Sequence, residues 1–338
     1  MRKLTYAIVF FALAAAGWGA YWFVGATATE RALAAWLETR AAEGWIATSQ
    51  SLDTRGFPNR FDITITGLEL ADPDTETAWS ADLFQLFSLS YKPLHVLAHW
   101  PGAQRFSSAD QTVTLTSEDM RGSFVLAAHP DLPVQSSTIT FEGTDALSSK
   151  GWTAHLAQGQ LSMRVNPAAS DPTLYDLYAT AQELTLSDTL LADLGNSATL
   201  PETVANATVD MQVKFSAPWD RRALEVARPQ PREVTLNSLA ARWGALDLSA
   251  AGALSIDRTG QPTGEIEVKA VNWREMVALA ETSGALTADS AAALRAVLGL
   301  LAAGGDDPQT LKITLRYARG LVYAGPLPIG TAPKVALP

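Results

Sequence analysis

From about residue 46 the dominant period of the sequence becomes two, with apolar and polar residues alternating in many segments. Residues 55–70 show this pattern clearly, because Phe61, Ile63 and Ile65 alternate with aspartate and threonine. Successive side chains of a strand point to opposite faces, so this period predicts strands with one apolar and one polar face. Turn-forming Gly, Pro, Asn and Asp clusters separate several of the segments. The sequence therefore predicts a mainly β (α+β) fold with a long, curved antiparallel β-meander.

The N-terminal residues differ from the rest of the chain. Arg2 and Lys3 precede an uncharged run from Leu4 to Val24. At about 1.5 Å per helical residue, this run can cross the roughly 30 Å hydrocarbon core of a bilayer. Because the basic residues precede the run, the positive-inside rule places the N-terminus in the cytoplasm and the bulk of the chain outside. We expect an inner-membrane protein with a single N-terminal span and a periplasmic domain.

A cleaved signal peptide is the alternative interpretation of the same run. The small residues Ala26, Thr27 and Ala28 have the spacing of a signal-peptidase site. The length of the run and the bulky Tyr21-Trp22-Phe23 segment favour an uncleaved anchor. After the run, apolar residues at helical spacing predict that the helix continues as a stalk and stops at Gly44.

The domain organisation follows from these patterns. A sub-boundary within the β-rich part is expected near residues 195–205. The expected segments are a transmembrane anchor at 1–25, a helical stalk at 26–45 and an extracytoplasmic β-rich domain at 46–338.

Two helices are expected late in the chain. Asn272 can cap a helix that begins at Trp273, with Glu275 completing a capping box, and this helix fades near Ser283. Thr287 can cap a second helix that runs to Gly304-Gly305. The second helix is apolar almost all round but too short to span a membrane. We expect the pair to pack as a hairpin on the apolar face of the sheet.

Composition excludes several classes of partner and site. The formal charge is −10 and the chain has no cysteine. A net negative charge repels phosphate backbones, so no nucleic-acid partner is expected. Without cysteine there are no disulfides, thiolate metal sites or cysteine nucleophiles.

No catalytic constellation is recognisable, so we expect no enzyme activity, no catalytic residue and no cofactor. His95 and His99 are four residues apart, but on a strand they would be about 13 Å apart, which is too far for one metal ion. Residues 72–76, "DPDTE", begin like a calcium loop yet lack its central glycine and bidentate glutamate, so a polar turn is predicted. No metal site is expected.

The segment Gly56-Phe57-Pro58 forms an elbow before the first long strand. Proline removes a backbone N–H and keeps the preceding residue extended, so the triplet can set the angle at which the strand enters the sheet. We interpret the elbow as an architectural hinge. The ten tryptophans are scattered along the chain, which favours anchoring roles over a ligand-stacking platform.

Three blocks together suggest a family. They are Gly56-Phe57-Pro58 with Arg60-Phe61, then Trp243-Gly244 through Leu248 to Gly252, then Gly264 with Asn272-Trp273. In this order they resemble an uncharacterised proteobacterial family, "domain of unknown function 2125". The resemblance covers nearly the whole chain and implies an inner-membrane-anchored envelope protein of no established activity.

A looser resemblance is one of architecture. A single N-terminal span followed by a long β-meander that ends in "GLVYAGPLPIG", residues 320–330, is similar to the AsmA-like envelope proteins, which are associated with lipid movement and outer-membrane assembly. This chain is far shorter than the members that bridge two membranes.

Two function classes remain open. In the first, the apolar sheet face is partly uncovered and handles lipid or envelope precursors. In the second, the face is covered and the protein is a non-enzymatic scaffold or assembly factor that binds protein partners through sheet edges. An uncovered apolar face would favour the first class. The lipid-facing candidates are Phe61, Ile63, Ile65, Leu254, Ile256, Leu315 and Tyr317.

Overall fold

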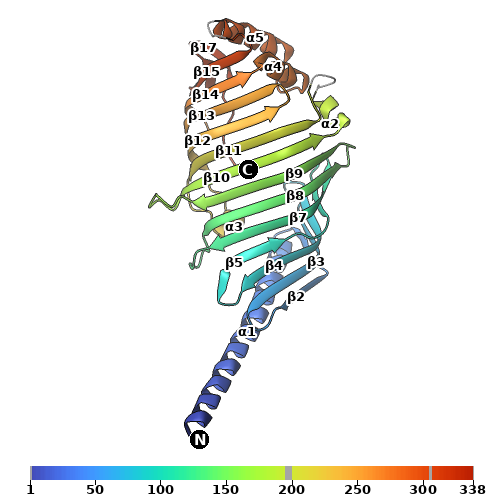
Figure 1. Ribbon diagram of the computed structural model, residues 1–338, viewed down its shortest axis with the longest axis vertical. Helices are drawn as coiled ribbons and strands as arrows, with labels where there is room; N and C mark the ends of the chain where they lie inside the picture. The colour runs from blue at the N-terminus through green and yellow to red at the C-terminus, as the bar shows by residue number, and fades with distance from the viewer. Residues whose placement is uncertain (1, 195–199, 304–306, 338) are drawn as a thin grey trace. The chain divides into compact units, whose positions relative to one another are not determined.

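The computed structural model describes residues 2–194, 200–303 and 307–337 (Figure 1). The chain divides into two compact units. Unit 1 contains Met1–Val125 and Ser148–Lys150, and unit 2 contains Leu126–Leu147 and Gly151–Pro338. The sub-boundary expected near residues 195–205 lies partly outside the described residues and stays a prediction.

Unit 1 consists of one long helix and seven strands. The strands pair antiparallel, with β3 between β2 and β4, and with β5 and β6 both pairing with β4 and β7. The elements are α1 (Arg2–Ala42), β1 (Ile46–Thr48), β2 (Ser51–Arg55), β3 (Arg60–Asp72), β4 (Thr77–Leu89), β5 (Lys92–His99), β6 (Gln104–Ser107) and β7 (Thr112–Leu126).

The helix α1 runs without a break through both the predicted anchor and the predicted stalk. Its C-terminal half is part of the core of unit 1. Leu33 and Leu37 pack against the buried side chains of Ile63, Ile65 and Leu68 on β3. The segment expected to be a stalk is therefore packed on the sheet.

Unit 2 is a meander in which each strand pairs antiparallel with the next one along the chain, from β8 to β17. Its strands are β8 (Val134–Ser148), β9 (Thr153–Val165), β10 (Leu174–Leu186), β11 (Thr203–Phe215), β12 (Pro231–Trp243), β13 (Leu246–Ile256), β14 (Pro262–Val271), β15 (Thr310–Ala318), β16 (Leu321–Ala324) and β17 (Leu327–Thr331). Its helices are α2 (Asp188–Asp193), α3 (Arg222–Glu225), α4 (Trp273–Thr282) and α5 (Ala288–Ala302).

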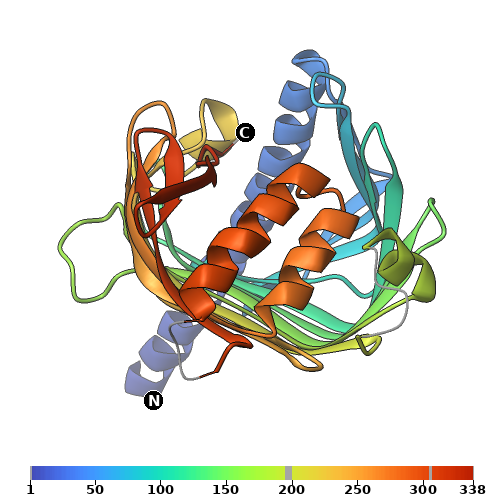
Figure 2. The ribbon, with the colours of Figure 1, turned by 90° about the horizontal axis from the view of Figure 1, so that it is seen from above.

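The helices α4 and α5 form the expected hairpin and lie inside the curve of the sheet of unit 2 (Figure 2). They build the largest buried cluster of this unit. The cluster joins Trp273 and Val277 of α4, Leu298 of α5, and Ala270 and Leu311 of the sheet. Burial of these apolar side chains, at roughly 25 cal/mol per Å², holds the hairpin on the sheet.

The start of α4 is where we predicted it, but the predicted capping box is wrong. Asn272 has a left-handed backbone (φ 57°) and makes no side-chain cap. Its amide Nδ2 instead donates to the carbonyl of Ala245, 2.7 Å away in the β12–β13 turn. The predicted cap of α5 is confirmed, because the Thr287 hydroxyl accepts from the backbone N–H of Ser290. The predicted end of α5 at Gly304-Gly305 lies outside the described residues.

The predicted fold class is confirmed. The described residues form a mainly β structure of antiparallel strands, preceded by one long helix and interrupted late by a helical hairpin.

Candidate functional site

A row of aliphatic side chains crosses eight consecutive strands of unit 2. Each member is directly opposite the next one on the neighbouring strand, so the row has no polar interruption. At about 4.8 Å between strands, seven steps give a length of about 34 Å. The row, here called the central row, consists of Ile139, Leu161, Ala179, Val209, Leu239, Ala250, Val268 and Ile313.

Two parallel rows, about two and four residues away on the same strands, lie on the same face because side chains at i and i+2 share a face. Both rows are also apolar. One row contains Met163, Leu177, Met211, Leu236, Gly252, Ile266 and Leu315. Another contains Val165, Tyr175, Val213, Val234, Leu254, Gly264 and Tyr317. Together these rows form one apolar face of the unit 2 sheet, here called the apolar face.

The apolar face is covered at two corners. The α4–α5 cluster packs on Leu248, Ala270, Leu311 and Ile313. At another corner, Trp219 of the β11–β12 connection packs on the cluster of Tyr175, Val213 and Phe215, and its ring meets Phe215 edge to face. Both covers are short compared with the length of the rows.

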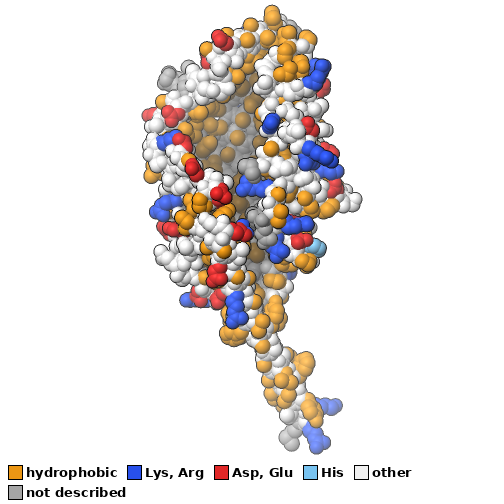
Figure 3. All heavy atoms as spheres, turned by 180° about the vertical axis from the view of Figure 1, so that it is seen from behind, with side chains coloured by type: hydrophobic (Ala, Val, Ile, Leu, Met, Phe, Trp, Pro, Cys, Tyr) orange, Lys and Arg blue, Asp and Glu red, His pale blue; other side chains and the backbone are white. Residues whose placement is uncertain are grey.

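Between the two covers the face is open to solvent in the described residues. Leu161 in the central row is 49% exposed, and the other members of this row are only half-buried. A hollow of about 330 Å³ lies here. Its apolar lining comes from four strands and includes Ile139, Leu161, Met163, Leu177, Ala179 and Met211. Figure 3 shows hydrophobic side chains gathered in the hollow of unit 2.

Two tyrosines, Tyr175 and Tyr317, are the titratable side chains in the rows of the apolar face. Burial raises the pKa of Tyr317, and it is also the largest cause of the raised pKa of Tyr175. The Tyr175 hydroxyl accepts a hydrogen bond from the backbone N–H of Trp219 at 3.0 Å. A raised pKa keeps both phenols neutral at neutral pH, so they add no charge to the apolar face.

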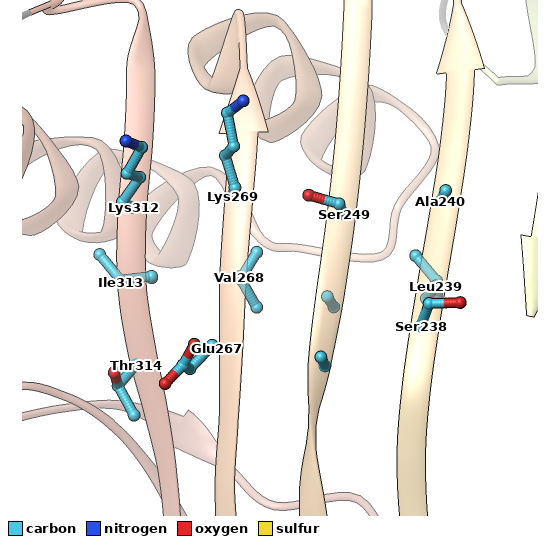
Figure 4. A pocket seen from close by; sticks show the side chains of 12 residues that line it. Ser238, Leu239, Ala240, Ser249, Glu267, Val268, Lys269, Lys312, Ile313 and Thr314 are labelled. Atoms are coloured by element: carbon cyan, nitrogen blue, oxygen red, sulfur yellow. The ribbon is translucent and has the colours of Figure 1, made fainter. Parts of the chain in front are cut away.

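The opposite face of the same sheet is polar and charged. A hollow of about 520 Å³ lies over β12 to β15, and its lining includes Leu239, Val268 and Ile313 of the aliphatic row as well as the polar side chains between them (Figure 4). Lys269 and Lys312 are direct cross-strand neighbours there, with Glu267 and Thr314 as the next pair. These four side chains are exposed, which is typical of a solvated sheet surface.

The predicted lipid-facing residues of unit 2 lie on the apolar face. Leu254, Leu315 and Tyr317 are in its rows and are half-buried. Ile256 is at the end of the β13–β14 hairpin, opposite Pro262, and is buried. The structure thus brings these four side chains into one continuous surface.

The predicted lipid-facing residues of unit 1 do not line an open surface. Phe61, Ile63 and Ile65 are at most 6% exposed. Phe61 packs on Trp22 and Ala26 of α1, and the two isoleucines pack under the later turns of the same helix. Their place in the core, under α1, corrects the expectation.

Sequence reasoning missed the centre of the face, including Ile139, Leu161, Met163 and Met211. The available signal was the alternation in residues 138–143 and 159–165, which marks strands but does not show which strands are neighbours. The alignment of their apolar residues into rows depends on strand register, which a local pattern cannot supply.

The other motif residues have structural roles. Gly56 precedes a cis Phe57–Pro58 peptide, and the backbone N–H of Arg60 donates a hydrogen bond to the Gly56 carbonyl at 2.9 Å.

The tryptophan motifs hold turns and a helix start in place. Trp243 donates its indole N–H to the carbonyl of Pro201, and Gly244 has a positive φ of 57° in the β12–β13 turn. Trp273, which is 2% exposed, donates to the Pro308 carbonyl.

The histidine pair shows no metal-site geometry. His95 and His99 are both on β5, as the strand interpretation predicted. His95 contacts Ser123 and His99 contacts Gln85, each through a side-chain hydrogen bond. Among the described residues, no cluster of three His, Asp or Glu side chains could hold a metal ion.

Residues 72–76 form the predicted polar turn. The Asp72 carboxylate accepts hydrogen bonds from the backbone N–H of Asp74 and the hydroxyl of Thr75.

These features define a class of protein: a mainly β chain with an apolar sheet face and one N-terminal helix long and apolar enough to span a membrane. The chain belongs to the family described as "Uncharacterized protein conserved in bacteria (DUF2125)", whose model matches residues 22–333. No curated protein and no solved structure matches the chain. The looser likeness to AsmA-like envelope proteins stays a prediction.

Proposed function

We propose that this protein is an inner-membrane-anchored periplasmic protein that binds lipid acyl chains, or envelope precursors carrying them, on the apolar face of unit 2. One observation carries the proposal. The central row of aliphatic residues, from Ile139 to Ile313, is uninterrupted over eight strands and is left open between its two corner covers. Soluble surfaces rarely leave so large an apolar patch without a ligand or partner.

The energetics of such binding are favourable without any polar site. Each buried CH₂ contributes about 0.8 kcal/mol, so ten methylenes supply roughly 8 kcal/mol before ordering costs. This is enough for reversible binding, which is what a carrier or a handling protein needs. The proposal includes no catalytic step and no cofactor.

The anchor is supported by how α1 packs. Trp22 and Ala26 are buried against Phe61, so a cut after Ala28 would remove part of the core of unit 1. The family model also begins at Trp22, before the possible cleavage site. Both observations favour a helix that stays in the mature protein, with the β units on the periplasmic side by the positive-inside rule.

The test uses the full-length chain purified from native membranes in a mild detergent, with lipid carried through purification measured by mass spectrometry. Leu161→Asp puts a charge on the apolar face at an exposed position, so it should lower the bound lipid while the far-UV spectrum stays β-rich. Gln160→Asp is the matched control, because it places the same charge one residue away on the opposite face.

Equal lipid content in the two variants and the unchanged protein would contradict acyl-chain binding on this face. A chain that carries no lipid and takes up no fluorescent fatty acid would instead favour the scaffold function.

One observation fits the scaffold as a second candidate: β17 pairs only with β16 in the described residues, and its Leu327 is 44% exposed. A protein partner could add a strand at this edge.

A further inference from the structure

Three aromatic side chains of α1 are hydrogen-bonded to the elbow region of unit 1. The indole N–H of Trp18 donates to the carbonyl of Pro58 at 2.9 Å, and that of Trp22 donates to the carbonyl of Arg60 at 2.7 Å. The hydroxyl of Tyr21 donates to the carbonyl of Ser90 at 2.6 Å, in the β4–β5 turn. These bonds dock residues 18–22 of the helix onto the elbow and the turn.

This docking fixes how deep the elbow lies if α1 spans a membrane. The uncharged run from Leu4 to Val24 is about 31 Å long as a helix, which matches a hydrocarbon core of roughly 30 Å. The part before Trp18, from Leu4 to Gly17, is only about 21 Å long. A span that kept the elbow out of the bilayer would therefore be too short to cross it.

The side chains around the docked helix suit an apolar environment. Phe57 is 55% exposed although its ring meets Trp22 and Phe23, and Tyr91 in the neighbouring turn is 59% exposed. Leu89 is also exposed, and the next residue after Tyr91 is the exposed Lys92. Aromatic and aliphatic side chains beside a basic residue are typical of the membrane–water interface.

Several backbone groups of the elbow and the turn have partners within the protein, which a region poor in water favours. Pro58 has no N–H, and its carbonyl accepts from Trp18. The N–H of Arg60 donates to the Gly56 carbonyl, and the N–H of Ser90 donates to the Asn59 carbonyl. The carbonyls of Arg60 and Ser90 accept from the helix.

We propose that the elbow at residues 57–59 and the turn at residues 89–91 are a membrane-contact surface. It enters the interfacial layer of the leaflet where α1 leaves the membrane, and its partner is the lipid itself. At Gly19 an added Cβ would lie 3.7 Å from the Phe57 ring. From Gly19 to Val24 the helix rises about 7.5 Å, within the depth of roughly 5–10 Å at which interfacial helices lie. This inference rests on the proposed anchor, and it is independent of acyl-chain binding on unit 2.

The contact would hold β3 and β4 at the lipid surface, because the elbow leads directly into β3 and the turn follows β4. The start of β3 and the end of β4 would then lie inside the headgroup region. A rigid contact of this kind differs from a domain tethered by a flexible stalk.

The experiment uses the absence of cysteine in the native chain. Single cysteines replace Phe57, Tyr91 or Asp74 in the full-length protein, each is labelled with an environment-sensitive fluorophore, and the protein is reconstituted in phosphatidylethanolamine–phosphatidylglycerol vesicles. Asp74 is the matched control, because it lies in the β3–β4 turn of the same unit, about 40 Å along β3 from the elbow. A fourth single-cysteine variant, Phe11→Cys, carries the same label and tests whether α1 lies in the bilayer.

The expected result is blue-shifted emission and strong quenching by nitroxide-labelled lipids at positions 57, 91 and 11, with neither at position 74. Quenching at 11 but not at 57 and 91 would overturn the contact surface and leave the anchor intact. No quenching at 11 would overturn the anchor and this inference with it. Because Tyr91 makes no ring contact in the described residues, Tyr91→Cys reports the surface even if Phe57→Cys disturbs the packing.

Discussion

At the scale of single residues, Phe61 joins the helix to the sheet. Its ring stacks on Trp22, and a Cβ added at Gly25 would lie 2.8 Å from its Cζ. Only glycine allows the helix to approach this closely. The neighbouring Phe57 has a different environment, since its ring lies on the helix but stays largely exposed.

We predict that Phe61→Ala destabilises unit 1 by about 3–5 kcal/mol, because it leaves a cavity between α1 and β3. The measurement is the free energy of unfolding of the full-length chain in detergent micelles, from a denaturant titration. Phe106→Ala is the control, since Phe106 is 42% exposed in the same unit and should lose much less. Equal losses for both variants would show that the Phe61 contact does not hold the helix.

Asp171 shows how a surface loop can make stability depend on pH. The pKa of its carboxyl is lowered from 3.8 to about 2, first by the Thr173 hydroxyl, then by the Thr173 backbone N–H and by Lys214. The Lys214 Nζ is 3.1 Å from the carboxylate. The unfolded chain therefore binds a proton at Asp171 at higher pH than the folded chain does.

We expect stability from this carboxylate to be complete above pH about 4 and to be lost as the pH falls towards about 2. In Asp171→Asn the group no longer titrates, so the decline of the unfolding free energy between pH 4 and 2 should be shallower than in the unchanged protein. Denaturant titrations at several pH values measure this slope. Identical slopes would mean that the Thr173 and Lys214 contacts do not lower the pKa in solution.

At the scale of elements, α1 has two environments along one helix. Its first half is exposed and apolar, as a membrane-spanning segment requires, and its second half covers β3 through Leu33 and Leu37. The helical period of the sequence predicted the helix itself. It did not predict the surface that the second half covers, because Leu33, Trp36 and Leu37 form a stripe that a stalk or a core helix would share.

We predict that Gly25→Val loosens the docking of α1 on unit 1, because the added side chain collides with the buried ring of Phe61. Gly17→Val is the matched control, since a Cβ at Gly17 has no neighbour within 4 Å. Both variants place the same residue in the same helix. Limited proteolysis of the elbow in detergent should be faster in Gly25→Val only, and equal protection in both would contradict the close contact.

The N-terminal caps of α4 and α5 show the limit of predicting a helix cap from local sequence. Thr287 caps α5 as predicted, because a β-region backbone lets its hydroxyl reach the Ser290 N–H. Asn272 is at the equivalent N-cap position of α4 but has φ 57°, and its side chain donates a hydrogen bond to the β12–β13 turn instead. A tertiary contact with Ala245, 27 residues earlier in the chain, decides this conformation. No short sequence window contains that information.

At the scale of the whole molecule, alternation predicted that there would be apolar sheet faces but not which of them would be covered. In unit 1 the face with Ile63 and Ile65 is closed by α1, whereas in unit 2 the face with Leu161 and Met211 is open between two short covers. The difference arises from where helices fold back onto the sheet. That choice depends on contacts between distant segments. The same period-two pattern therefore gave candidates on the apolar face of unit 2 at Leu254, Leu315 and Tyr317, and candidates buried under α1 at Phe61, Ile63 and Ile65.

The last prediction concerns the mature chain as a whole. Cleavage after Ala28 would expose Phe61, break the hydrogen bonds of Trp18, Tyr21 and Trp22, and leave unit 1 without its contact to the first half of α1. We therefore expect the intact protein from native cells to retain the N-terminal segment and to stay in the membrane fraction after alkaline extraction. Intact-mass measurement checks this directly. A mature chain that begins at Thr29 in the soluble periplasmic fraction would contradict both the anchor and the membrane-contact surface, because neither can exist without residues 4–24.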